Sequence, residues 1–400
     1  FCLTAAAKKR DSARMPGNCL TRMSICLPLI SLEQVLTRFY KNILTPVLPV
    51  MFLFAVLMSG CVEQESFLTA SDNPESSGEF ELCSPEGMAE YLDGLPAVSD
   101  VNEWQNEFGP GITISTSHYE IHTTMLEPLT LSRVPGFMES AYSAYQQQLP
   151  CPVSTGHKFK VYLFDTREQW EDFTRDFTGK ASDLYLKIKK GAYYLKGACV
   201  TYNIGRSRTF SVLAHEGWHQ FNCRHFKYRL PSWLDEGIAT LFEASEYHDG
   251  FFSFDPARNA SRLGSLRKQL MRGKLIPLEE LIRLNPAEVV SLDDTQAVMA
   301  FYGQAYALIR FLREEEYGKY LPMYQQMLLD AKEGNWPINK KLGETAADRN
   351  VPITGKWNRH VSPKLFEYYV DDCESLQEAY IHFCKKIVHN VRIKTLRRYR

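Results

Sequence analysis

Apolar and polar residues alternate at every second position in three stretches of the first half of the chain. These stretches are rich in β-branched and aromatic side chains, which predicts strands, and they cover residues 111–124, 158–165 and 191–203. Two stretches between them repeat their apolar residues at helical spacing, and they cover residues 132–150 and 166–177. This order predicts a small mixed β-sheet that carries helices.

The rest of the chain has mainly helical spacing. The helical stretches cover residues 232–246, 276–284, 295–317, 319–333 and 363–389. A further helix around residues 210–221 lies between the two patterns. We therefore expect an α+β fold, in which a small mixed sheet with helices precedes a mainly helical part and the 210–221 helix lies between them.

The amino-terminal region has the pattern of a targeting segment. Basic residues precede an unbroken apolar run from Val50 to Met58, which is too short to span a bilayer but suits the core of a signal peptide. The junction that follows resembles a bacterial lipobox, in which Cys61 would be acylated, although Met58 stands where that pattern favours leucine. We expect an exported, membrane-anchored lipoprotein, with plain secretion as the alternative.

Composition and charge divide the chain further. Residues 1–60 are expected to be an upstream region and a signal peptide, 61–80 the anchor cysteine and a flexible tether, 81–385 one folded domain and 386–400 a basic tail. That tail could contact lipid headgroups or the acidic body, and no fold signature for nucleic acid accompanies it. Six cysteines of the folded domain could pair in an exported protein or remain free thiols.

The 210–221 helix contains the sequence His215-Glu216-Gly217-Trp218-His219. On a helical wheel, both histidines fall opposite the apolar stripe, and their four-residue spacing lets both imidazoles bind one metal ion. Glu216 lies about 100° round from His215, where it can reach a water beside the ion without binding the ion. The chemistry of a zinc-activated water with a glutamate base asks for this arrangement.

The His-Glu-x-x-His motif arises by chance in roughly one or two per cent of chains this long. The motif alone is therefore a moderate signal for a metal site, and a third ligand would strengthen it. Glu236 lies opposite the apolar stripe of the helix predicted for residues 232–246, and it is flanked by the small residues Gly237, Ala239 and Thr240. Small side chains allow a neighbouring helix to come close enough for Glu236 to reach a shared metal ion. The alternative is that Glu236 is an ordinary solvated glutamate. Thr240 could hydrogen-bond a metal ligand, and Asp235 is expected only to cap its helix.

These two segments, "HEGWH" and "WLDEGIA", resemble the gluzincin class of zinc metallopeptidases. Within that class the chain is similar to bacterial peptidase-MA-like proteins, many of them known only as a domain of unknown function, over roughly residues 112–385. The resemblance implies a zincin-like second part, one Zn²⁺ bound by His215, His219 and Glu236, and Glu216 as general base.

The resemblance extends, with departures, to two further segments. A tyrosine in a Tyr-x-Lys-Gly-Ala stretch stabilises the oxyanion in aminopeptidase-like gluzincins, and Tyr302 aligns with it, although Gln304 and Ala305 replace Lys and Gly. A core aromatic is the alternative, and Tyr306 is a weaker candidate. The 191–203 strand has no acid where aminopeptidases hold the free amine of the substrate, which disfavours that activity. It could instead pair with an extended peptide.

These features together predict a zinc metallopeptidase that hydrolyses peptide bonds in a peptide or protein substrate. Two alternatives stay open. One is a non-catalytic zinc-containing lipoprotein that acts as a binding or scaffold module, and the other is hydrolysis of a non-peptide amide. Glu216 favours catalysis, because a purely structural zinc has no need of a carboxylate beside its ligands.

Overall fold

The computed structural model describes residues 83–188, 191–285, 295–349 and 354–389. The chain divides into two compact units, Phe1–Glu75 and Ser76–Arg400, and every described residue belongs to the second unit. The expected signal peptide, the anchor cysteine Cys61, the tether and most of the basic tail lie outside the described residues. Within them, no helix has the length and apolar character needed to cross a bilayer, and all six cysteines are free thiols.

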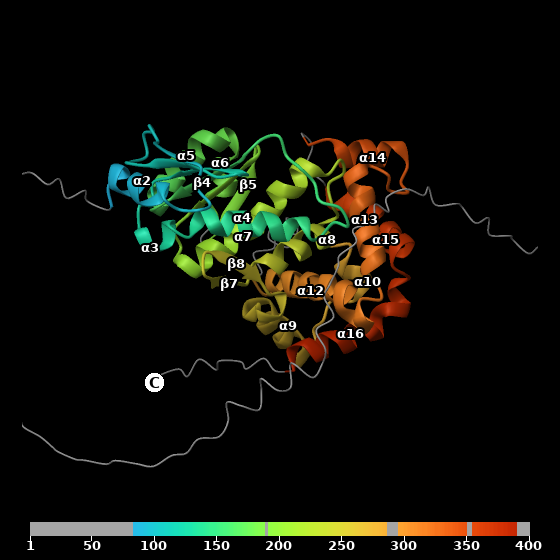
Figure 1. The fold of residues 1–400 in the computed structure, drawn as a ribbon. Coiled ribbons are helices and arrows are strands. Elements are labelled where there is room, and N and C mark those ends of the chain that lie inside the picture. Colours follow the sequence, from blue (N-terminus) through green and yellow to red (C-terminus); the bar gives the residue numbers. More distant parts are fainter. Residues whose placement is uncertain (1–82, 189–190, 286–294, 350–353, 390–400) are drawn as a thin grey trace, which may run out of the picture. The chain divides into compact units, whose positions relative to one another are not determined.

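A mixed six-stranded sheet occupies the first part of the described chain (Figure 1). The strands are β1 (Asp100–Glu103), β2 (Ile112–Ser115), β3 (Tyr119–Thr123), β4 (Phe159–Phe164), β5 (Ala192–Leu195) and β6 (Ala198–Tyr202). Their order is β1-β2-β3-β4-β6-β5, with β3, β4 and β6 parallel and the other neighbours antiparallel. Two of the three expected strand stretches form hairpins, and the mixed sheet of an α+β fold is confirmed.

Helices cover both faces of this sheet. On one face α4 (Val134–Gln146) and α7 (Arg206–His225) pack over Cys199, and on the other α5 (Arg167–Thr178) packs over Val200. Adjacent residues of β6 thus face opposite cores, as the two-residue period of a strand requires. Shorter helices complete this part, and they are α2 (Pro85–Asp93), α3 (Pro128–Leu131), η1 (Gly179–Ala181) and α6 (Ser182–Tyr185).

The second part is mainly helical, as its spacing predicts. Its helices are α8 (Ser232–Ala239), η2 (Thr240–Phe242), η3 (Pro256–Arg258), α9 (Ala260–Met271), α10 (Leu278–Leu281), α12 (Thr295–Glu314), η4 (Glu315–Tyr317), α13 (Leu321–Glu333), α14 (Lys340–Ala347), α15 (Gly355–Tyr369) and α16 (Cys373–Val388). The single helix predicted for 363–389 is two helices, because Asp372 caps a new start by accepting a hydrogen bond from the Ser375 backbone N–H (3.0 Å).

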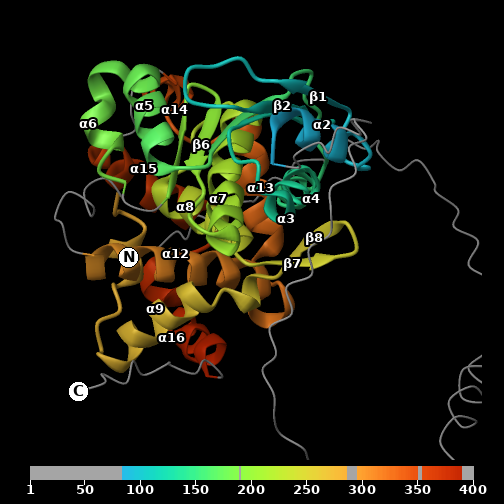
Figure 2. The same cartoon turned by 90° about the vertical axis from the view of Figure 1, so that its left-hand side faces the viewer.

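A β-hairpin replaces the last part of the helix predicted for 232–246. Strand β7 (Ser245–His248) pairs with β8 (Phe251–Phe254), and the hairpin projects beside α3 and α4 (Figure 2). Asp249 and Gly250 form its turn at φ values of 41° and 100°, the left-handed conformation that an Asp-Gly pair favours. That dipeptide was the local signal for the hairpin, and helical periodicity alone did not account for it.

Helix α8 packs closely on α12 through Gly237. A Cβ atom on this residue would lie 2.8 Å from the carbonyl oxygen of Ala305 and 2.6 Å from Cγ1 of Ile309. Small residues beside Glu236 therefore do let a neighbouring helix approach, and the helix at Gly237 is α12. This contact fixes how α8 presents Glu236.

We expect Gly237→Ala to lower the free energy of unfolding by about 1–3 kcal/mol, because an added methyl group at a tight backbone contact forces the helices apart. Urea unfolding at an unchanged slope measures the loss. Gly264→Ala on α9 is the matched control, since nothing lies within 4 Å of a Cβ atom there. A Gly237→Ala protein as stable as the parent would contradict the close packing.

Candidate metal centre

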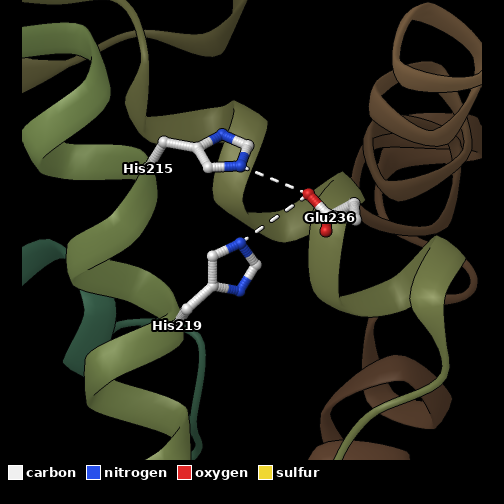
Figure 3. Close-up of side chains that lie close together, drawn as sticks. All are labelled: His215, His219 and Glu236. Atoms are coloured by element: carbon white, nitrogen blue, oxygen red, sulfur yellow. Dashed lines mark hydrogen bonds and ion pairs between the residues drawn. The ribbon is translucent and has the colours of Figure 1, made fainter. Parts of the chain in front are cut away.

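Three predicted ligands meet between α7 and α8. Glu236 Oε2 lies 3.2 Å from His215 Nε2 and 3.7 Å from His219 Nε2 (Figure 3). One ligand atom from each residue lies within 4.8 Å of the others. Two ligands of a tetrahedral zinc are about 3.4 Å apart when each is about 2.0–2.1 Å from the ion, so the spacing fits such an ion.

The backbone of α7 is held against α4 at the level of this cluster. The Tyr145 hydroxyl of α4 donates a hydrogen bond to the carbonyl oxygen of Ala214 (2.7 Å). A Cβ atom on Gly217 would lie 2.5 Å from the same hydroxyl, so glycine is required where the two helices touch. This contact lies on the buried side of α7 and directs both histidines towards α8.

Carboxylates hold the other nitrogen of each imidazole. His215 Nδ1 lies 3.0 Å from Glu243 Oε1, and His219 Nδ1 lies 3.1 Å from Asp235 Oδ1. A ring that donates its Nδ1–H to a carboxylate keeps the lone pair of Nε2 for a metal. Both Nε2 atoms face Glu236, so the tautomers required for metal binding are set by the protein.

Glu243 was not predicted as part of the site. The Arg262 Nε donates to its Oε2 at 2.7 Å, and the Asn259 side-chain amide donates to the same oxygen at 2.9 Å. Burial opposes the ionised form of Glu243, but His215 and Arg262 lower its pKa to about 2. The sequence did contain a signal for Glu243. It follows Glu236 by seven residues, so in the helix predicted for 232–246 both carboxylates would lie on one face, two turns apart.

Asp235 corrects a further expectation. Helix α8 starts after Pro231 without a side-chain cap, and the carboxylate of Asp235 points to α7 instead. Its Oδ1 accepts hydrogen bonds from Trp218 Nε1 (3.0 Å) and Asn222 Nδ2 (2.6 Å) while it contacts His219. Asp235 is therefore a positioning residue for an imidazole rather than a helix cap.

Thr240 does not contact the ligands in the way expected. Its hydroxyl donates to the carbonyl oxygen of Gly237 at 2.6 Å, and the side chain is fully buried. Among the described residues, the contacts to the imidazole Nδ1 atoms come from Asp235 and Glu243. Thr240 thus supports the turn that follows α8.

Negative charge surrounds the two imidazoles. Burial opposes their charged forms, yet hydrogen bonds to Glu236 and Glu243 raise the pKa of His215 to about 9. Burial also opposes the charged form of His219, and the charges of Asp235 and Glu236 outweigh it and raise the pKa. Three carboxylates around two imidazoles favour a cation at their centre, and a donor set of two nitrogens and one oxygen suits zinc.

A cleft of about 1450 Å³ opens beside these side chains, and His215, Glu216 and Tyr302 line it. Burial raises the pKa of Glu216, so this carboxyl takes up a proton more readily than an exposed glutamate does. Burial and the charge of Glu236 raise the pKa of Tyr302, which keeps its hydroxyl protonated. The structure therefore places both predicted catalytic side chains on the cleft wall beside the candidate ligand His215.

Tyr306 belongs to the core instead of the cleft. It is fully buried, and its hydroxyl donates to the carbonyl oxygen of Pro256 at 2.5 Å and accepts from Arg310 at 2.9 Å. Tyr302, four residues earlier on α12, lies with its ring centroid 6.2 Å from that of His215. Tyr302 therefore lines the cleft, whereas Tyr306 does not.

We expect Glu243→Gln to weaken zinc binding by about 10–100-fold, the usual effect of losing a carboxylate that orients a metal-bound imidazole. The amide keeps the shape but loses the charge that His215 and Arg262 both contact. Competition with a chromophoric chelator measures the affinity. Glu246→Gln, three residues along the chain and paired with Arg258, should leave it unchanged, and equal affinities for both variants would exclude this role of Glu243.

Residues 209–329 match the model of a family described as "Protein of unknown function (DUF1570)". The matched segment contains the histidines, Glu236 and Tyr302. A search of curated proteins finds no match. The family description states no activity, so function has to be argued from the site.

Proposed function

We propose that the protein is a zinc-dependent metallopeptidase of the gluzincin type, related to peptidase-MA-like proteins. The convergence of His215 Nε2, His219 Nε2 and Glu236 Oε2 beside the carboxyl of Glu216 supports this proposal. Structural zinc sites are normally closed by four protein ligands, whereas catalytic sites use three and keep one position open. The described residues provide three ligands, and the cluster borders a cleft.

The residues of the chain divide the work as follows. His215, His219 and Glu236 would hold Zn²⁺, which supplies acidification of a water and polarisation of the scissile carbonyl. Glu216 would take a proton from the attacking water and give it to the departing amine. Tyr302 would donate a hydrogen bond to the oxygen of the carbonyl as negative charge develops there.

The edge of the sheet supports an extended peptide as substrate. Strand β5 is the last strand on its side of the sheet, and Ala192 at its start lines the cleft. An edge strand can add a further strand through backbone hydrogen bonds. Residues Ala192–Leu195 offer no carboxylate for a free amine, so we propose that the protein cleaves internal peptide bonds. From the amino-terminal sequence pattern we also propose that it is exported and that Cys61 anchors it to a membrane.

Zinc content and turnover test the proposal together. The purified protein is analysed for metal, then incubated with a library of blocked peptides, with Glu216→Gln as the control. One zinc per chain and cleavage that disappears in Glu216→Gln support a metallopeptidase. Zinc without cleavage of any peptide would favour the binding-module or non-peptide alternatives, and a protein that binds no zinc would overturn both the enzyme and the zinc module.

A further inference from the structure

Three arginines gather at one end of the cleft. Arg206 and Arg208 lie in the first turn of α7, and Arg133 lies between α3 and α4. The Nε of Arg206 donates to the hydroxyl of Thr130 on α3 at 3.1 Å, so these segments meet. We call Arg133, Arg206 and Arg208 the basic end of the cleft.

Positive charge is balanced elsewhere in the cleft but not at the basic end. Arg262 pairs with Glu243, and Arg258 pairs with Glu246. At the basic end, the Arg206 guanidinium lies 4.0 Å from the carboxylate of Glu127. Two other positive charges therefore remain to be compensated there.

Neither of these two charges has a carboxylate partner in the described chain. The Arg133 guanidinium lies over the ring of Tyr247, 4.5 Å from its centroid. Arg208 is exposed, and the described residues provide it with neither an ion pair nor a side-chain hydrogen bond. With Glu127 set against Arg206, the basic end keeps an excess of positive charge from Arg133 and Arg208, and such an excess concentrates ligands of the opposite sign.

Arg208 also has a defined position relative to the metal ligands. It precedes His215 by seven residues on the same helix, which is about 10.5 Å along the axis and about 20° from the same line. Ser211 and Val212 lie between them and line the cleft. An extended peptide advances about 3.3 Å per residue, so for a substrate that runs along α7, Arg208 would lie about three residues from a bond cleaved beside His215.

We infer that the basic end binds the carboxylate of an acidic substrate side chain, about three residues to one side of the scissile bond, with Arg208 as the specificity-determining residue. This inference rests on the proposed peptidase function. An arginine can hold a carboxylate through two parallel hydrogen bonds. Only one side of the scissile bond is selected, because the basic end lies at the amino-terminal end of α7.

Digestion of a blocked peptide library, with cleavage sites identified by mass spectrometry, tests the selection. In the parent protein, Asp and Glu should be enriched two to four residues from the cleaved bond, on one side. A matched peptide with Gln for Glu should be cut about tenfold more slowly, which is the lower end of what a hydrogen bond to a charged group contributes. Arg208→Glu should reverse the preference towards Lys and Arg.

Arg224→Glu is the matched control, because it makes the same charge change on an exposed residue of α7 that does not line the cleft. It should keep the acidic preference. Equal cleavage of the Glu and Gln peptides by the parent, or an unchanged preference in Arg208→Glu, would overturn the inference and leave the peptidase proposal standing.

Binding separates the two proposals when no peptide is cut. The same two peptides, labelled with fluorescein, are titrated with parent, Arg208→Glu and Arg224→Glu proteins and followed by anisotropy. Absence of cleavage counts against the peptidase. About tenfold tighter binding of the Glu peptide, lost in Arg208→Glu alone, supports the basic end as an acidic-peptide site, and equal binding overturns it.

Discussion

Glu216→Gln should lower kcat by about 10²–10⁴-fold, the range that a general base contributes, while the protein retains its zinc. The amide has the same shape but cannot accept the proton of the attacking water. Neither His215 nor His219 uses Glu216 to hold its Nδ1 atom, since Glu243 and Asp235 do so. The metal site should therefore survive the change.

Metal content by mass spectrometry and steady-state cleavage of one library-derived peptide give the two measurements. Equal zinc content in parent and variant is the internal control, because it separates lost chemistry from lost metal. If Glu216→Gln cleaved the peptide at the parental rate, Glu216 would not be the base. If it lost zinc as well, its effect on turnover would be a consequence of metal loss.

Glu236→Ala should weaken zinc binding by more than the 10–100-fold expected for an orienting carboxylate, because it removes a ligand atom itself. Two imidazoles from one helix then remain, with no donor from α8. A metal that binds only the folded protein raises its Tm. A chelator should therefore lower the Tm of the parent but not that of Glu236→Ala.

Glu90→Ala is a suitable control for this experiment, because Glu90 is exposed on α2 and does not line the cleft. Its Tm should fall on chelation as the parental Tm does. Far-UV circular dichroism shows whether Glu236→Ala keeps its helices. A folded Glu236→Ala protein with parental zinc affinity would show that Glu236 is not a ligand.

Local patterns in the sequence were enough to predict strands β2 to β6, the helix α7 and the position of its two histidines on one face, whereas β1 and the β7–β8 hairpin lie outside the predicted strand stretches. A four-residue spacing on one helix is geometry that needs no tertiary information. Glu236 could be predicted because small residues surround it, and this pattern has a packing cause at Gly237. The Asp249-Gly250 pair was an equally local signal for a hairpin turn. It was missed because helical spacing predicted a helix as far as residue 246.

Contacts between distant segments could not be predicted in the same way. Arg262 comes from α9 to hold Glu243, although nineteen residues separate them. Asp235 contacts three side chains of α7 because α8 packs against that helix, and no residue pattern within α8 predicts this packing. The position of β5 at the edge of the sheet likewise depends on strand order, which the alternation of apolar residues does not contain.

The two helices that carry the candidate ligands pack against different parts of the fold. Tyr145 of α4 holds α7 in the first part of the fold, which contains the sheet, and Gly237 packs α8 against α12 in the mainly helical second part. A bound ion would bridge the interface between α7 and α8, so part of its binding free energy would stabilise the contact between the two parts. Loss of zinc would then weaken the interface between α7 and α8 as well as stop turnover, and the less stable protein would be degraded more readily.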